Sequence, residues 1–286
     1  MNYMPQVMSY LGSTEDITEL YITPKAYITE KRDGKLIRVS DTPLTPEDVR
    51  DTLVALRSHA SSVMGPLGKE GVFSFGVQNI GRFRVNYITQ RGSYVIHLTK
   101  TPFKIPELDQ ICTDKEAIKQ LDELFRLHKG GGIVVFFGKT HIRASTLIYS
   151  LLQHVCNSYN KVIFIIEKPL SFLLKHGLSL VIQMEVGVDV NNFEDGINDA
   201  LHMSPDILYL GYREVGFRQQ ADIIAGIADA GTLVLINYPN AEEDIVLRHF
   251  GDYVHHVKAF VSIEPSEAGT MNVTIKNTKY MERGNR

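Results

Sequence analysis

The sequence lacks several features that would mark a secreted or membrane-spanning protein. It has two cysteines, Cys112 and Cys156, which are too few for a disulfide framework. No apolar run approaches the roughly 18 residues that a spanning helix needs. The first twenty residues lack the charged-then-apolar pattern of a signal peptide. These absences predict a cytoplasmic protein and leave room for docking on a membrane complex.

The chain also lacks an excess of either charge. Its 30 basic and 33 acidic side chains give a net charge of −3, and there is no basic arm. Whole-chain charge therefore predicts no nucleic-acid partner. The length of 286 residues and the 44% share of hydrophobic residues predict one or two domains with a substantial core.

The first third of the chain has the pattern of an α+β domain. Short strands with a hairpin turn are predicted over residues 17–40. A helix follows, with Thr45 as its N-cap and Pro46 at its first position. Residues 71–100 then alternate apolar and polar side chains, as antiparallel strands do. Together these segments predict one domain over residues 1–101.

The second part of the chain alternates apolar strands with helices. Residues 102–120 contain two prolines and predict an extended linker, and residues 121–286 predict a parallel sheet with crossover helices. The candidate strands are IVVFF, KVIFII, DILYLG and TLVLIN, with a helix over residues 215–230 between the last two. The polar tail after Ser266 is expected to fray.

The stretch GGIVVFFGKTHIRASTLIYS passes from an apolar strand through a glycine turn into a helix. Such turns hold phosphate because unpaired N–H groups and the helix dipole converge there. Gly138 and Ser145 match the first glycine and the hydroxyl of the phosphate-loop pattern, but Arg143 replaces its second glycine and Ala144 its lysine. We expect these replacements to weaken nucleotide binding on the order of a hundred- to a thousandfold.

The order of motifs resembles the secretion and pilus motor ATPases, the hexameric group that contains the type IV pilus retraction motor PilT and the type II secretion ATPases. LTPEDV and FSFGVQNIGRFRVNYITQRG are similar to the N-terminal domain of that family. Then GGIVVFFGKTHIRAST falls at its phosphate loop, VIFIIEKPLSF at its acidic box, SPDILYLGYRE at its second nucleotide motif and AGTLVLINYPNAEE at its histidine box. The resemblance covers about residues 15–250. It implies a PAS-like α+β N-terminal domain followed by an α/β, RecA-like P-loop NTPase core with a central, mainly parallel sheet and a shortened C-terminus.

The departures from this family fall on the residues of its chemistry. The acidic box, Glu-Asp-Pro in the family, is Glu-Lys-Pro here, with Glu167 retained. Tyr212 replaces the glutamate that polarises the attacking water, and a neutral phenol cannot act as that base. Glu214 lies two residues on and would point the same way if the strand continued, so it is an alternative base. The two box histidines of the family fall on Thr232 and Pro239.

Arg143 has two interpretations. It either fills the empty phosphate pocket and pairs with Glu167, because a carboxylate without its metal attracts a cation, or it points to solvent. We favour the pairing. Lys139 and Thr140 complete the degenerate turn, and Lys139 is a second candidate for contact with phosphate.

The arginines of the N-terminal domain are retained. Arg82, Arg84 and Arg91 lie in the RFRVNYITQRG stretch. In the hexamers of this family such arginines lie near the neighbour's nucleotide, where an arginine supplied in trans stabilises transferred phosphate. The resemblance thus implies that they contact an adjacent subunit, Arg84 and Arg91 foremost. The alternative is that alternate arginines line the solvent face of an antiparallel strand.

These observations predict a catalytically inactive paralogue with no catalytic residue, no metal site and no cofactor. It would serve as an accessory or regulatory subunit of a pilus or secretion machine, through contact with a catalytic motor ATPase homologue or an inner-membrane platform protein. We expect a homo- or hetero-oligomer that is cytoplasmic, on the inner face of the bacterial inner membrane. Two alternatives stay open: a working ATPase that binds ATP and magnesium and powers retraction or secretion, and a ligand-sensing module that uses the remodelled pocket.

Overall fold

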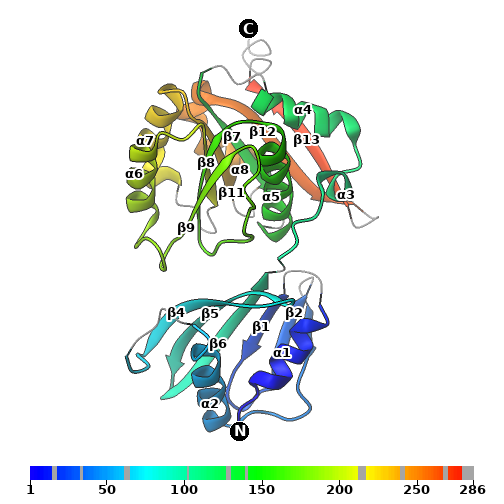
Figure 1. Ribbon diagram of the computed structural model, residues 1–286, viewed down its shortest axis with the longest axis vertical. Helices are drawn as coiled ribbons and strands as arrows, with labels where there is room; N and C mark the ends of the chain where they lie inside the picture. Colours follow the sequence, from blue (N-terminus) through cyan, green and yellow to red (C-terminus); the bar gives the residue numbers. More distant parts are fainter. Residues whose placement is uncertain are drawn as a thin grey trace. The chain divides into compact units, whose positions relative to one another are not determined.

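The computed structural model spans residues 1–286 and describes 1–14, 18–32, 35–60, 65–101, 103–126, 130–138, 141–211, 217–238, 242–266 and 270–278, without the side chains of 141–143 and 217–219. The chain divides into two compact units, Met1–Lys104 and Ile105–Arg286 (Figure 1). Within the described residues, no helix combines the length and the apolar character needed to cross a membrane.

The first unit is an antiparallel sheet with two helices on one face (Figure 1). The helices are α1 (Met4–Gly12) and α2 (Pro46–Arg57). The strand order is β3-β2-β1-β6-β5-β4, with bounds β1 (Thr18–Ile22), β2 (Thr29–Arg32), β3 (Lys35–Arg38), β4 (Glu70–Val77), β5 (Gly81–Gln90) and β6 (Ser93–Thr101). Alternate residues of these strands, such as Phe83 and Val85, meet Leu53 of α2 in the core. The strands and helix expected in this region are confirmed, and the tip of the hairpin at residues 33–34 lies outside the described residues.

Helix α2 begins where the sequence predicts. Thr45 accepts a hydrogen bond from the Asp48 N–H at 3.2 Å, and the Asp48 carboxylate accepts one from the Thr45 N–H at 2.8 Å. Each side chain thus satisfies a backbone donor that the first turn leaves open. Hydrogen bonds from the Met1 ammonium group, first, and from Thr45 lower the pKa of Asp48 to about 2.

The second unit is a seven-stranded sheet, parallel except at one edge. Its order is β13-β12-β7-β11-β10-β8-β9, and only β13 runs antiparallel to its neighbour. The strands are β7 (Gly132–Gly138), β8 (Val162–Glu167), β9 (Leu180–Glu185), β10 (Ile207–Gly211), β11 (Leu233–Tyr238), β12 (Val257–Pro265) and β13 (Met271–Asn277). The four apolar runs singled out in the sequence are β7, β8, β10 and β11, which are confirmed as central parallel strands.

Helices cover both faces of this sheet (Figure 1). Their bounds are α3 (Leu108–Ile111), α4 (Lys115–Arg126), α5 (His141–Ser158), α6 (Phe193–Met203), α7 (Phe217–Asp229) and α8 (Glu243–His249), followed by the 3₁₀ helix η1 (Gly251–His256). On one face, Val135 and Ile166 pack with Ile224 of α7. Because side chains alternate along a strand, Glu167 and Tyr209 point to the opposite face, which α5 covers.

Two sequence predictions are wrong. The linker expected over residues 102–120 contains α3 and the beginning of α4, because the Gln110 side chain accepts a hydrogen bond from the Glu107 N–H at 3.2 Å and Leu108 is buried. In the tail expected to fray after Ser266, Met271–Asn277 form β13, which pairs with β12, and residues 267–269 and 279–286 lie outside the described residues. Polar residues alternate along β13 because it is an edge strand with one half-exposed face, a pattern that resembles a solvated tail.

Candidate functional site

The candidate site lies where β7, β8, β10 and β11 end, on the face covered by α5. The register pairs Gly211 of β10 with Glu167 of β8 on one side and with Asn237 of β11 on the other. Gly138 ends β7, beside β11. Open parallel sheets bind ligands at the carboxyl ends of their strands, so these residues lie where the sheet favours a ligand.

Glu167 is fully buried and is surrounded by hydrogen-bond donors. Its Oε2 accepts from the Tyr149 hydroxyl at 2.8 Å and from the Ser171 N–H at 2.6 Å. Its Oε1 accepts from the hydroxyls of Ser171 at 2.8 Å, Tyr209 at 3.2 Å and Ser145 at 3.3 Å. These five donors, which belong to the described residues, are neutral groups of the chain itself. They satisfy the acceptor capacity of the carboxylate in the way that a buried polar group requires.

Helix α5 supplies two of these donors because Ser145 and Tyr149 are four residues apart and share one helix face. Ser145 is the residue that matches the hydroxyl position of the phosphate-loop pattern, where the side chain binds magnesium. Here its oxygen is buried, donates toward Glu167 and accepts a hydrogen bond from Asn237 Nδ2 at 3.1 Å. The hydroxyl is therefore already used within the protein.

The two tyrosines of the site are held in their neutral form. Burial raises the pKa of Tyr149 well above its ordinary value, and the negative charge of Glu167 raises it further. The same two causes, in the same order, raise the pKa of Tyr209 well above its ordinary value. The rings lie edge to face with centroids 5.7 Å apart. Both phenols thus act as hydrogen-bond donors to the carboxylate at neutral pH and are unsuited to act as bases.

Two glycines make room for this arrangement. A Cβ at Gly211 would lie 2.4 Å from Cγ of Glu167, so a side chain there would displace the glutamate. A Cβ at Gly138 would lie 2.2 Å from the backbone oxygen of Ile263 in β12. The glycine of the phosphate-loop pattern therefore has a packing reason in this chain, at the contact between β7 and β12.

The structure describes only part of the predicted site. It brings Gly138, Ala144, Ser145 and Glu167 to one end of the sheet, with Ala144 buried where the pattern has its lysine. The other predicted positions lie outside the described residues or side chains: Lys139, Thr140, Arg143, Tyr212 and Glu214. Pairing of Arg143 with Glu167 accordingly stays a prediction.

The retained arginines differ in exposure. Arg84 of β5 is buried, with its Nε donating to Asn86 Oδ1 at 3.4 Å. Arg82 is half-buried, and Arg91 is exposed in the turn after β5 with a φ of 51°. The burial of Arg84 argues against a row of arginines that simply faces solvent. A contact with an adjacent subunit stays a prediction.

Sequence reasoning missed Tyr149, Ser171, Tyr209 and Asn237. A signal existed for two of them, because Tyr209 and Asn237 interrupt the apolar strands ILYLG and LVLINY near their carboxyl ends. No comparable signal marks Tyr149 or Ser171, whose roles depend on how α5 and the turn after β8 fold back toward Glu167.

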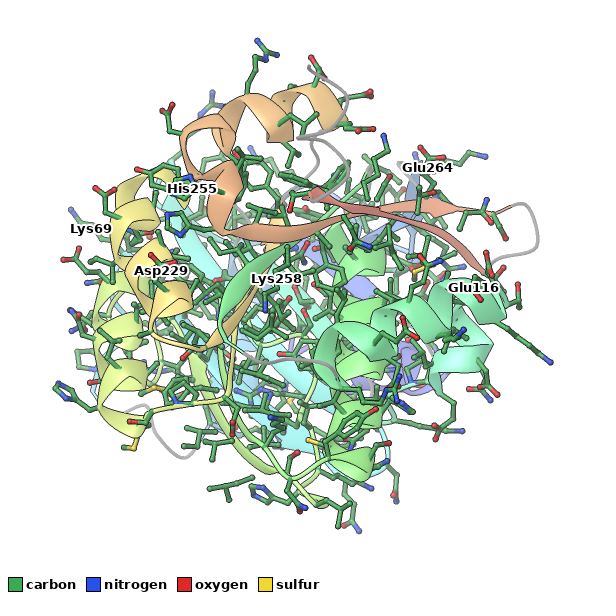
Figure 2. The ribbon with its side chains drawn as sticks, turned by 90° about the horizontal axis from the view of Figure 1, so that it is seen from above. Lys69, Glu116, Asp229, His255, Lys258 and Glu264 are labelled. Carbon is green, nitrogen blue, oxygen red and sulfur yellow. The ribbon has the colours of Figure 1, made fainter. Side chains whose placement is uncertain are left out.

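Histidines elsewhere in this unit form pairs. The rings of His255 and His256 are 3.8 Å apart, and His256 Nδ1 lies 2.8 Å from Oδ1 of Asp229. Figure 2 shows His255 on η1 and Asp229 on the neighbouring helix α7. Within the part of the chain that the structure describes, no three metal-ligating side chains are grouped closely enough to hold a metal ion.

Comparison with known proteins finds type IV pilus ATPases among the relatives of this chain. The chain is 29% identical over 218 residues to the type IV pilus ATPase PilU of Pseudomonas aeruginosa. The aligned region covers 76% of this chain and 55% of that protein. It is 28% identical over 180 residues to the type IV pilus retractation ATPase PilT of the same organism, covering 63% and 50%. The chain spans about half the length of these curated relatives. No family model matches it.

Solved structures agree at the level of the fold. A crystal structure of the pilus retraction motor PilT with bound ADP superposes with a TM-score of 0.70 at 24% identity, over 96% of this chain and 81% of that one. The ATPase DotB of Legionella pneumophila superposes with a TM-score of 0.67 at 18% identity, over 96% and 81%. The predicted mixed α/β architecture with a RecA-like core is confirmed, and the PAS-like description of the first unit stays a prediction.

Proposed function

We propose that this chain, a relative of the type IV pilus and secretion motor ATPases, is a non-catalytic paralogue that acts as an accessory or regulatory subunit of a pilus or secretion machine. It would work on the cytoplasmic side by protein–protein contact. Its partner would be a catalytic motor homologue or a membrane platform protein, in a homo- or hetero-oligomer. One observation carries the proposal. Hydroxyl groups of the chain itself donate hydrogen bonds to the Glu167 carboxylate, at the place where the resemblance puts nucleotide and metal.

The geometry supports this proposal in two steps. A nucleotide with magnesium would need the hydroxyl of Ser145, which already donates to Glu167 and accepts from Asn237. Glu167 in turn accepts hydrogen bonds from buried groups on α5, on β10 and in the turn after β8. Breaking such a set leaves buried polar groups unsatisfied, at about 1–3 kcal/mol for each group.

The residue types support it further. Ala144 provides no charge where the phosphate-loop pattern has its lysine, and it is buried. Tyr212 provides no base at neutral pH where the family has its glutamate. Positioning and electrostatic stabilisation account for almost all of the catalysis of phosphoryl transfer, so a site without these groups has few means of performing it.

A working ATPase would depend on Lys139 or Arg143 for phosphate and on Glu214 as base. A ligand sensor would depend on a ligand that enters the same pocket. No described contact favours either alternative. The hydrolysis assay separates the working ATPase from the main proposal, and a thermal shift on addition of a ligand would support the sensor.

The test is ATP hydrolysis by the purified chain with magnesium, beside an intact hexameric relative as positive control. We expect no turnover above background from the native chain or from Glu214→Gln. A double variant, Arg143→Gly with Ala144→Lys, restores the glycine and the lysine of the phosphate-loop pattern. We expect it to stay inactive because Tyr212 is unchanged. Magnesium-dependent turnover by the native chain that Glu214→Gln abolishes would make the protein a motor with a rearranged site.

A second assay addresses the role. The chain is mixed with a catalytic homologue from the same machine, and co-elution and the homologue's ATPase rate are measured. We expect a complex and a changed rate. Absence of both, together with absence of turnover, would contradict the accessory-subunit proposal.

A further inference from the structure

The hairpin β2–β3 at the edge of the first unit has an exposed apolar side chain where an edge strand would normally carry charge. All four residues of β3 are exposed. Leu36 is 71% exposed and Ile37 is 38% exposed. Proteins usually blunt exposed edge strands with charged or polar residues, because an apolar edge invites association. An exposed leucine at this position is therefore a candidate contact for a partner surface.

Basic side chains surround this leucine. The register places Lys31 of β2 directly opposite Leu36, and Arg38 follows two residues on, so the three side chains share one face. Lys35 and Ile37 lie on the other face of β3. Residues 29–38 contain four basic and two acidic residues. One of those acids, Glu30, is buried and accepts two hydrogen bonds from Arg32 at 2.8 and 2.9 Å.

An aromatic ring adds to the same surface. The guanidinium carbon of Arg38 lies 4.5 Å from the ring centroid of Tyr27, which is half-buried just before β2. Cations, a tyrosine and an exposed leucine within one hairpin form the combination that suits a membrane interface. There apolar side chains enter the headgroup boundary and the charges meet lipid phosphates.

We infer that the β2–β3 hairpin binds the surface of an anionic lipid bilayer, with Leu36 and Ile37 inserted at the headgroup boundary and Lys31, Lys35 and Arg38 against lipid phosphates. Leu36 and Ile37 leave opposite faces of β3, so edge-on insertion into a bilayer covers both. A protein partner laid against one face would cover only one of them. The inference is independent of whether the chain hydrolyses ATP.

The test is co-sedimentation of the full chain with vesicles of phosphatidylglycerol and phosphatidylcholine, and with vesicles of phosphatidylcholine alone. We expect binding to the anionic vesicles and its loss in 1 M salt, where screening acts over roughly 3 Å. Each cation near such a surface strengthens binding by roughly fivefold. The triple variant Lys31→Gln, Lys35→Gln, Arg38→Gln should therefore bind on the order of a hundredfold more weakly. The variant Leu36→Asn should bind the anionic vesicles roughly tenfold more weakly than the native chain.

Matched controls use exposed residues of the second unit. Lys115→Gln, Lys119→Gln and Lys175→Gln remove the same three charges, and Leu178→Asn changes a leucine that is 59% exposed. We expect both controls to bind as the native chain does. Native-level binding by the hairpin variants would overturn the inference. An equal loss of binding in the charge control would also overturn it, because net charge alone would then explain the binding. So would a chain that binds an acidic protein and does not bind the vesicles.

Discussion

At the scale of single residues, the Glu167 carboxyl group has no contact with solvent. The side chains around it decide what the site can do. A carboxylate taken out of water costs several kcal/mol unless other groups replace its hydration. Tyr149, Tyr209, Ser145 and Ser171 provide that replacement from within the chain. The described part of the site thus supplies hydrogen-bond donors to Glu167 from within the chain.

Tyr149→Phe tests the value of one such donor. The change removes the hydroxyl that lies 2.8 Å from Glu167 Oε2 and keeps the ring. We expect the free energy of unfolding in urea to fall by about 1.5–3 kcal/mol, as for a hydrogen bond to a charged group. Tyr253→Phe is the control, since its hydroxyl donates to Asp222 at an exposed position, and it should change little. Equal stability of Tyr149→Phe and the native chain would argue against the network.

Alkaline pH tests the two buried phenols. Their pKa values are raised in the folded chain, so the unfolded chain loses these protons first as the pH rises through about 10. The contribution of these two phenols to stability should be constant below that pH and should fall above it, by about 1.4 kcal/mol per pH unit for each phenol. We predict a shallower fall for the double variant Tyr149→Phe, Tyr209→Phe, measured by urea unfolding from pH 8 to 11. Parallel profiles for the two proteins would be the contrary result.

The sequence predicted only those site residues that a local motif marks. Ser145 follows from the spacing of the phosphate-loop pattern and Glu167 from the family resemblance, and the structure brings them within hydrogen-bond reach. Tyr149 joins them because α5 presents it toward β8, and Tyr209 because β10 lies beside β8. Such contacts depend on helix packing and strand order, which spacing along one segment does not specify.

At the scale of elements, β7 and its neighbour β12 constrain the start of the phosphate-loop region. Gly138 ends β7 and pairs with Ile263 of β12. Sequence reasoning matched this glycine to the first glycine of the phosphate-loop pattern. The close approach of the Ile263 carbonyl gives a second reason, which holds without any bound phosphate. A retained first glycine is therefore weak support for nucleotide binding in this chain.

Gly138→Ala tests that assignment. A Cβ would lie 2.2 Å from the Ile263 backbone oxygen, so β7 or β12 must shift, and we expect a loss of about 1–3 kcal/mol in unfolding free energy. Gly226→Ala is the matched control, because nothing lies within 4 Å of a Cβ there and Gly226 is inside α7. Alanine at 226 should stabilise by about 0.5–1 kcal/mol. A neutral Gly138→Ala would show that the contact imposes no constraint.

The success of sequence reasoning varied among the elements for a physical reason. Strands β7, β8, β10 and β11 are buried on both faces and are continuous apolar runs, which periodicity detects. Strands β9 and β13 form the two edges, are partly exposed and carry mixed residues, so they were missed or taken for a tail. Edge strands are specified by pairing with a neighbour more than by their own pattern.

At the scale of the whole molecule, the chain combines an antiparallel unit with a RecA-like unit, over about half the length of its curated relatives. The first unit retains the arginines and the capped helix α2 of the resemblance. The second retains the sheet while its described site residues bind one another. We propose that this chain keeps the fold while its site has lost the chemistry.

The most direct test of that proposal is calorimetric titration of the native protein with ATP, with and without magnesium, beside an intact hexameric relative. The account predicts no saturable heat up to millimolar nucleotide in either condition, because Ser145 and Glu167 are already hydrogen-bonded within the chain. Saturable, magnesium-dependent binding at micromolar ATP would contradict it. That result would mean the network opens to admit nucleotide.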